Sequence, residues 1–181
     1  SLPQASSAKR SNMIYLVVDG YNIIGAWEEL QRLKEKDIGQ ARDRLLDMMA
    51  EYQAYSGYHV IVVFDAYFVK GKRATYRKSK LDVIFTKENE TADECIERLV
   101  KELQNVRDKV YVATSDYDEQ RTIFGSGALR KSARELYIEM EAMQKDISRR
   151  IISQNQYKPI SKIPLDPEVQ AVFEKWRRGR K

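Results

Sequence analysis

Cysteine and histidine are almost absent from this sequence. Among its 181 residues, Cys95 is the single cysteine and His59 the single histidine. An internal disulfide is therefore excluded, and no cluster of cysteine and histidine has the spacing of a zinc site. We interpret Cys95 as a small buried apolar residue without a chemical role. His59 lies at the start of a predicted strand, and we do not expect it to act as a catalytic base. A reducing compartment fits this composition, so we expect a cytoplasmic protein.

Long apolar runs and the common enzymatic fingerprints are also missing. The sequence contains no run of about 18 apolar residues, the length that a transmembrane helix needs, so we expect no membrane partner. Residues 1–12 have no apolar core of the kind that a secretory signal needs, and we interpret them as a tag remnant or disordered leader. The sequence contains no GxSxG elbow, Walker A loop or GxGxxG fingerprint.

The remaining composition is that of one globular domain with appendages. Hydrophobic residues make up 43% and charged residues 33% of the chain, enough for one substantial core. We expect that core in residues 13–155, followed by a basic extension over residues 156–181. The net charge of +5 permits a polyanionic partner without requiring one.

Apolar periodicity predicts the fold class. Short β-branched runs predict strands at Ile14 to Val18, Val60 to Phe64, Val83 to Phe85 and Val110 to Ala113. Helical spacing predicts helices at Trp27 to Lys36, Gln40 to Tyr55, Thr91 to Leu103, Tyr117 to Phe124, Ala128 to Ile152 and Glu168 to Trp176. Thr91 and Glu94 have the spacing of a capping box at the start of one helix. This alternation predicts an α/β fold with three layers and a mainly parallel sheet.

Acidic residues follow the predicted strands. Asp19, Asp65 and Asp116 each come directly after or soon after a strand, and Asp93 lies in the first turn of the helix after the third strand. The carboxyl ends of parallel strands share one edge of a sheet, so these carboxylates would repel one another unless a cation neutralised them. Mg²⁺ and Mn²⁺ prefer such oxygen ligands and support phosphodiester hydrolysis. For Asp65, a structural role in a turn is as consistent with the pattern as a supporting one.

Two basic regions predict contacts with nucleic acid. The segment from Phe68 to Lys80 has no acid and interleaves basic with aromatic residues, and the second region surrounds Trp176 near the end of the chain. Arg130, Lys131 and Arg134 form a further basic patch in the sequence. Basic groups attract phosphates and aromatic rings stack on unpaired bases, although a solvated loop or a solubility tail would look alike. The residues expected to bind RNA are Lys70, Lys72, Arg73, Tyr76, Arg77, Lys78, Lys80, Arg130, Lys131, Arg134, Trp176, Arg177 and Arg178.

Several sequence blocks carry a family resemblance. They are VVDGYNIIGAW, VIVVFDA, IFTKENETADECIE, VATSDYDEQ, GALRKSARE and FEKWRRG, in this order from Met13 to Arg178. On these blocks the chain resembles the YacP-type NYN-domain ribonucleases, which have a PIN-like α/β/α fold. The resemblance implies catalytic, metal-holding roles for Asp19, Asp93 and Asp116, and supporting roles for Asn22 and Asp118.

The resemblance also implies a substrate and a partner. It implies endonucleolytic cleavage of messenger RNA in the A site of the translating ribosome, dependent on Mg²⁺ or Mn²⁺. The basic loop and tail would face messenger or ribosomal RNA, and we expect a monomer. The alternative is a ribosome- or RNA-binding factor that does not cleave. A small-molecule phosphatase is disfavoured, because the polybasic loop suits a polymer and no DxDx(T/V) motif is present.

Overall fold

A computed structural model describes residues 12–66, 75–78, 80–105, 107–116, 121, 123, 125–157 and 167–178. The chain divides into two compact units, Ser1–Met143 and Gln144–Lys181, of which the first contains the sheet. The predicted division into a leader, a domain at residues 13–155 and a tail stays a prediction. No helix within the described ranges is long and apolar enough to cross a membrane.

The sheet has six strands in the order β3-β4-β2-β1-β5-β6. All neighbouring strands run parallel except β3 and β4, which pair antiparallel at one edge. The predicted α/β fold with a mainly parallel sheet is therefore confirmed. The strands are β1 (Ile14–Asp19), β2 (His59–Phe64), β3 (Thr75–Lys78), β4 (Leu81–Phe85), β5 (Lys109–Ala113) and β6 (Leu129–Lys131).

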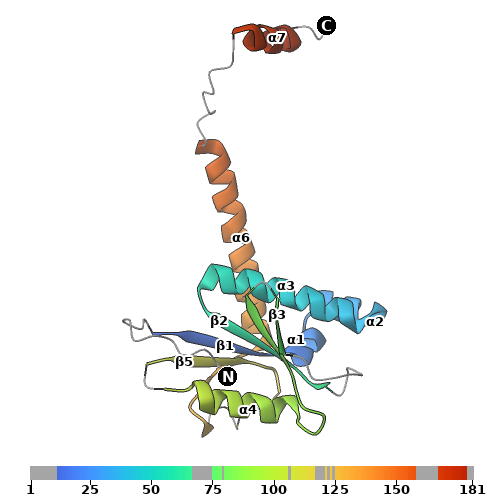
Figure 1. The fold of residues 1–181 in the computed structure, drawn as a ribbon, viewed down its shortest axis with the longest axis vertical. Helices are drawn as coiled ribbons and strands as arrows, with labels where there is room; N and C mark the ends of the chain where they lie inside the picture. The colour runs from blue at the N-terminus through green and yellow to red at the C-terminus, as the bar shows by residue number, and fades with distance from the viewer. Residues whose placement is uncertain are drawn as a thin grey trace. The chain divides into compact units, whose positions relative to one another are not determined.

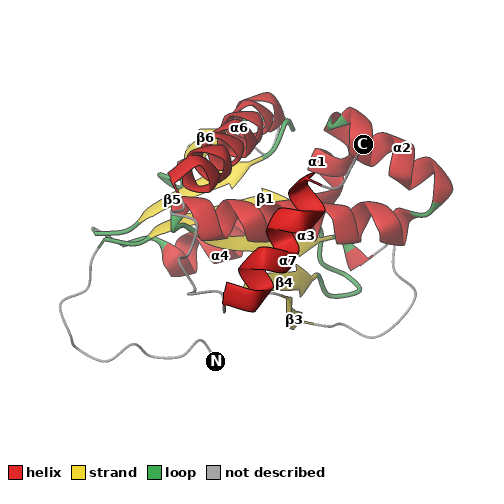
Figure 2. Cartoon of the chain, turned by 90° about the horizontal axis from the view of Figure 1, so that it is seen from above, coloured by secondary structure: helices red, strands yellow, loops and turns green. Residues whose placement is uncertain are grey.

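Helices cover both faces of the sheet, as Figure 1 shows for α4 on one side and α3 on the other. Figure 2 shows α3 in red crossing over the yellow strands. The helices are α1 (Gly20–Ala26), α2 (Glu28–Lys36), α3 (Ile38–Ser56), α4 (Ala92–Leu103), α6 (Ala133–Tyr157) and α7 (Pro167–Arg178).

Alternation along the strands divides the core between the two faces. Val17, Ile61, Val63 and Val112 belong to one buried cluster with the apolar stripe of α4. Because successive strand residues point to opposite faces, Leu16 and its equivalents on the other strands face the side of α3. Both faces of the inner strands are thus buried, which explains their nearly continuous apolar sequence.

The helix ends follow local sequence signals. Thr91 accepts a hydrogen bond at its Oγ1 from the Glu94 amide (3.2 Å), so the predicted cap of α4 is confirmed. Asp37 caps α3 in the same way through the Gly39 amide (2.8 Å). Gly57 ends α3 with φ of +74°, a left-handed conformation that glycine adopts without strain.

Four elements differ from the sequence predictions. The predicted helix from Ala128 begins instead at Ala133, because Leu129–Lys131 pairs with β5 as the edge strand β6. Ser132 then caps α6, with its Oγ accepting from the Glu135 amide (3.0 Å), as the Ser-x-x-Glu pattern at this position indicates. Thr75–Lys78 in the basic loop is a strand and Gly20–Ala26 is a helix, neither of which the sequence patterns predicted. The short helix predicted at Tyr117 to Phe124 lies mostly outside the described residues.

Candidate active site at the carboxyl edge of the sheet

Asp19 ends β1, and Asp116 follows the carboxyl end of the neighbouring strand β5. These strands pair in parallel with Val18 opposite Ala113, so Asp19 and Thr114 leave the sheet side by side. The Thr114 hydroxyl donates to Asp19 Oδ2 (3.5 Å) and accepts from the Asp116 amide (3.1 Å). Asp19 is 8% exposed and Thr114 is fully buried. Thr114 thereby links the Asp19 carboxylate to the backbone amide of Asp116. The sequence prediction did not assign this role to Thr114.

Asn22 fixes the segment that carries Asp116. Its Oδ1 accepts a hydrogen bond from the Ser115 amide (2.7 Å), which joins α1 to the chain after β5. This contact makes Asn22 a positioning residue for the backbone beside the acids. Its predicted supporting role in the reaction stays a prediction.

Asp65 lies on the other side of Asp19, because β2 is the other neighbour of β1. It follows β2 directly and is half-buried. Beside it, Thr86 accepts at Oγ1 from the Ala66 amide (3.0 Å) and donates its own amide to the Phe64 carbonyl (3.0 Å). These bonds hold the chain ends of β2 and β4 together at this edge.

Asp93 reaches the same edge from a helix. It is exposed in the first turn of α4, whose Ala92 packs into the cluster that contains Val17 and Val63. A helix that crosses back over a parallel sheet begins at the carboxyl edge of that sheet. The neighbouring Glu90 pairs with Arg98 (2.7 Å), which orders the loop before the helix.

The ligand atoms at this edge are of the chemical type that a hard divalent cation binds. Asp19 and Asp116 with the Thr114 hydroxyl offer oxygen donors of the type that Mg²⁺ and Mn²⁺ take. Within the part of the chain that the structure describes, no three His, Cys, Asp or Glu side chains form a group that could hold a metal ion. The metal site of Asp19, Asp93 and Asp116 therefore stays a prediction, and Asp118 lies outside the described residues.

The histidine and the cysteine have structural positions. His59 begins β2, at the opposite end of the strand from Asp65, and its Nε2 contacts Asp82 Oδ2 (2.6 Å). Cys95 is fully buried in α4, and burial raises the pKa of its thiol to about 11, assisted by the negative charge of Glu90. Its predicted place as a buried apolar residue is confirmed.

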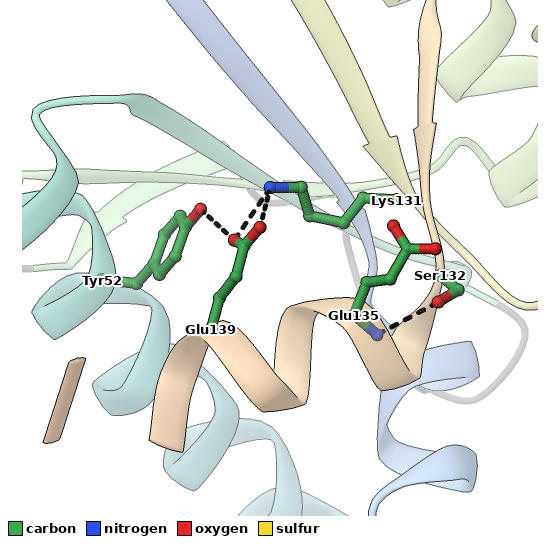
Figure 3. A network of polar contacts seen from close by, with 5 residues as sticks. All are labelled: Tyr52, Lys131, Ser132, Glu135 and Glu139. Carbon is green, nitrogen blue, oxygen red and sulfur yellow. Dashed lines mark hydrogen bonds and ion pairs between the residues drawn. The ribbon is translucent and has the colours of Figure 1, made fainter. Parts of the chain in front are cut away.

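Lys131 corrects one predicted RNA contact. Its side chain is buried and its Nζ lies between the two carboxylate oxygens of Glu139, at 2.6 and 2.8 Å. Glu139 also accepts from the hydroxyl of Tyr52 (2.7 Å), so the carboxylate joins α3, β6 and α6, as Figure 3 shows. Burial and this bond raise the pKa of Tyr52. Lys131 is thus an internal ion-pair residue and is unavailable to RNA.

This ion pair reaches the acids through the backbone. The Lys131 carbonyl accepts from the Thr114 amide (3.1 Å), and Lys131 Nζ lies 5.0 Å from the centre of the Tyr111 ring. Because the Lys131 side chain is anchored at Glu139, it fixes the end of β6 beside Thr114, the residue that links Asp19 to Asp116.

The other predicted RNA-binding residues are placed in part. Lys70, Lys72 and Arg73 lie outside the described residues, as do the side chains of Tyr76, Arg77, Lys78, Trp176 and Arg177. Lys80 is exposed at the turn between β3 and β4, Arg130 is half-buried, and Arg134 and Arg178 are exposed. Among the predicted RNA-binding residues of the first unit, Lys80 and Arg134 are therefore the ones with a described, exposed cationic side chain.

Comparisons with known proteins decide the family. Residues 16–178 match the family described as the YacP-like NYN domain. The chain belongs to this family. A curated relative, "Uncharacterized protein YacP" of Bacillus subtilis (strain 168), is 55% identical over 167 residues, which covers 92% of this chain and 98% of the relative.

Solved structures agree with the family. The crystal structure of Rae1 (YacP) from Bacillus subtilis has a TM-score of 0.72 at 55% identity, covering 91% of this chain and 95% of that one. A second crystal structure of Rae1, with a tryptophan replaced by leucine, has a TM-score of 0.71 at 51% identity, covering 92% and 96%. NYN domains are PIN-like nucleases, so membership supports an RNA-related, nuclease-like role for this YacP-like chain.

Proposed function

We propose that this YacP-like protein is a cytoplasmic, metal-dependent endoribonuclease that hydrolyses messenger RNA in the A site of the translating ribosome. The observation that carries the proposal is the buried Asp19, connected to Asp116 through the Thr114 hydroxyl at the carboxyl edge of the sheet. Membership of a nuclease family supports it. Asp93, in the first turn of α4, supplies the third acid of the proposed site.

Asp19, Asp93 and Asp116 would hold Mg²⁺ or Mn²⁺ in this proposal. When bound, the cation neutralises phosphate charge, polarises the phosphoryl group and makes water a stronger nucleophile near neutral pH. The chain's own residues orient the acids. Thr114 holds Asp19 by its hydroxyl and the Asp116 backbone by the same oxygen, and Asn22 holds the intervening Ser115 amide. In-line attack by water would break the bond between phosphorus and the 3′ oxygen, leaving a 5′ phosphate and a 3′ hydroxyl.

Positive charge supports the choice of an RNA substrate. The chain carries 32 basic against 27 acidic residues, and its acid-free segment from Phe68 to Lys80 is adjacent in sequence to Asp65. Cations beside an acidic edge would draw the phosphate backbone towards a site that otherwise repels it. Of the predicted RNA-binding cations, the exposed Arg134 lies at this edge, at the start of α6 after β6, whereas the exposed Lys80 precedes β4 at the opposite edge of the sheet.

Two substitutions test the nuclease. Asp19→Asn and Asp93→Asn each remove one carboxylate charge with little change in volume, so both variants should fold. Each should lower cleavage on the order of a hundredfold or more, as loss of one group that stabilises a transition state does. Glu94→Gln is the matched control, since Glu94 is an exposed acid next to Asp93 in the same turn.

The assay is incubation of the protein with translating ribosomes, followed by mapping of new RNA 5′ ends with and without EDTA. New ends that need the divalent ion, appear with Glu94→Gln and disappear with Asp19→Asn or Asp93→Asn are the expected result. Unchanged cleavage by either asparagine variant contradicts the proposed site. Stable ribosome binding without any new 5′ ends in the wild type contradicts the nuclease and leaves the RNA-binding alternative.

A further inference from the structure

A pocket of about 360 Å³ lies next to the acidic edge. Its lining comes from the junction of α1 and α2, the segment after β5 and the first turns of α6. All of these segments belong to the first compact unit. The residues that matter for its chemistry are Trp27, Glu28, Ser115, Arg134 and Tyr137.

Trp27 gives the pocket a rigid wall. It is 4% exposed, and its indole Nε1 donates to the Ala133 carbonyl (2.9 Å), which ties the α1–α2 junction to the start of α6. The Tyr137 ring packs edge-on against the Trp27 ring with the centroids 5.6 Å apart. Tyr137 itself is 39% exposed, so an aromatic ring that is held from one side remains accessible to a ligand.

Ser115 connects the pocket to the candidate active site. It lines the pocket, it immediately precedes Asp116, and its amide is held by Asn22 Oδ1. A group that fills the pocket therefore lies one residue away from the acids. For an RNA strand lying across these acids, that place corresponds to a nucleotide beside the scissile phosphate.

The lining chemistry selects among ligands. Unpaired bases stack on aromatic rings, arginine binds the adjoining phosphates, and a carboxylate accepts from an exocyclic amino group. Tyr137, Arg134 and Glu28 supply one group of each kind. The volume is at the small end of the range of about 300 to 1,000 Å³ for small-molecule sites, which suits one base rather than a larger ligand.

We propose that this pocket binds one unpaired nucleobase of the RNA substrate, next to the phosphate that is cleaved, with Tyr137 as the stacking residue. The inference rests on the proposed function for its substrate class and adds a subsite to it. By binding one base of the RNA, the pocket positions the adjacent phosphate at Asp19 and Asp116.

A binding measurement tests the subsite without requiring cleavage. The probes are two labelled single-stranded oligomers of equal length, one of ordinary RNA and one with every base removed, titrated with the full chain in EDTA. Tyr137→Ala should weaken binding of ordinary RNA roughly five- to thirtyfold, within the range for loss of one base stack, and leave the abasic oligomer unaffected. Tyr137→Phe keeps the ring and should match the wild type. Ile138→Ala, at a 53% exposed neighbour on the same helix, is the control.

The outcomes separate the subsite from the nuclease. If Tyr137→Ala weakens both oligomers equally, or neither, the base pocket is wrong even when the wild type cleaves. If the wild type cuts no RNA with Mg²⁺ or Mn²⁺ but Tyr137→Ala loses only base-dependent affinity, the pocket stands and the proposed nuclease fails.

Discussion

Replacing Gly20 with alanine should destabilise the protein beside Asp19. A Cβ at this position would lie 2.3 Å from Phe64 Cε1, 2.5 Å from Phe64 Cδ1 and 3.0 Å from the Val63 carbonyl oxygen. Carbon atoms in contact normally lie about 3.5 to 4.0 Å apart, so the Phe64 ring must move by more than about 1 Å.

The Phe64 ring has little room for that movement. It is fully buried, it stacks on Phe85 with the centroids 5.4 Å apart, and Tyr21 packs against it at 5.1 Å. Overpacking of a core costs typically about 1 to 3 kcal/mol, and the constraints place this case in the upper half. Relief of the helical glycine returns up to about 1 kcal/mol. The net loss should be about 1 to 3 kcal/mol, or a fall in Tm of roughly 2 to 12 °C.

Gly25→Ala is the matched control for this substitution. Gly25 lies in the same helix α1, and a Cβ there would meet nothing within 4 Å. The control should therefore raise stability by up to about 1 kcal/mol, the ordinary preference of a helix for alanine over glycine. Thermal and urea unfolding of both variants would measure the difference.

A double variant identifies the cause. Phe64→Leu removes the ring atoms that meet the new Cβ, so Gly20→Ala should cost less in the Phe64→Leu background than alone. Equal stability of Gly20→Ala and Gly25→Ala would refute the reasoning. The same conclusion follows if the Phe64→Leu background leaves the cost of Gly20→Ala unchanged.

Two further predictions concern buried groups. Glu139→Ala leaves Lys131, whose side chain is 9% exposed, without its carboxylate and should cost about 2 to 4 kcal/mol in urea unfolding, the partial exposure of Glu139 softening the usual penalty. Glu97→Ala, from an exposed pair with Lys101, should cost less than about 1 kcal/mol, and equal losses would refute the burial argument. Burial raises the pKa of Cys95 from its ordinary 9.0 to about 11, so the stabilisation by the protonated thiol is complete below pH 9 and disappears as pH rises through 11. Wild-type stability should therefore fall more steeply over that interval than that of Cys95→Ala, and parallel curves would contradict this.

The inner sheet and the acids at its edge could be predicted from the sequence alone. The runs at Ile14 and Val110 are apolar on both faces, which predicts buried parallel strands, and parallel strands place their carboxyl ends together. Asp19 and Asp116 therefore come to the same edge of the sheet because of short-range sequence patterns combined with one rule of topology. The cap of α4 at Thr91 is equally local, since it depends on residues three apart.

Other features were decided only by residues distant in sequence. No helix was predicted at Gly20 from the sequence, but this residue is buried in α1 against Phe64, 44 positions later. Lys131 reads as one of three surface cations, but the carboxylate of Glu139 and the ring of Tyr111 hold it inside. The type and charge of a side chain do not by themselves determine whether the fold buries it, because burial depends on the residues that pack against it.

The pocket belongs to the same category. Trp27 and Tyr137 are separated by about 110 positions and lie together because the start of α6 packs beside the junction of α1 and α2. Periodicity along one segment indicates which face of that segment is apolar, and most of the strands and helices could be assigned an apolar face in this way. Which faces pack together follows from the tertiary structure, since it depends on the packing of the whole chain.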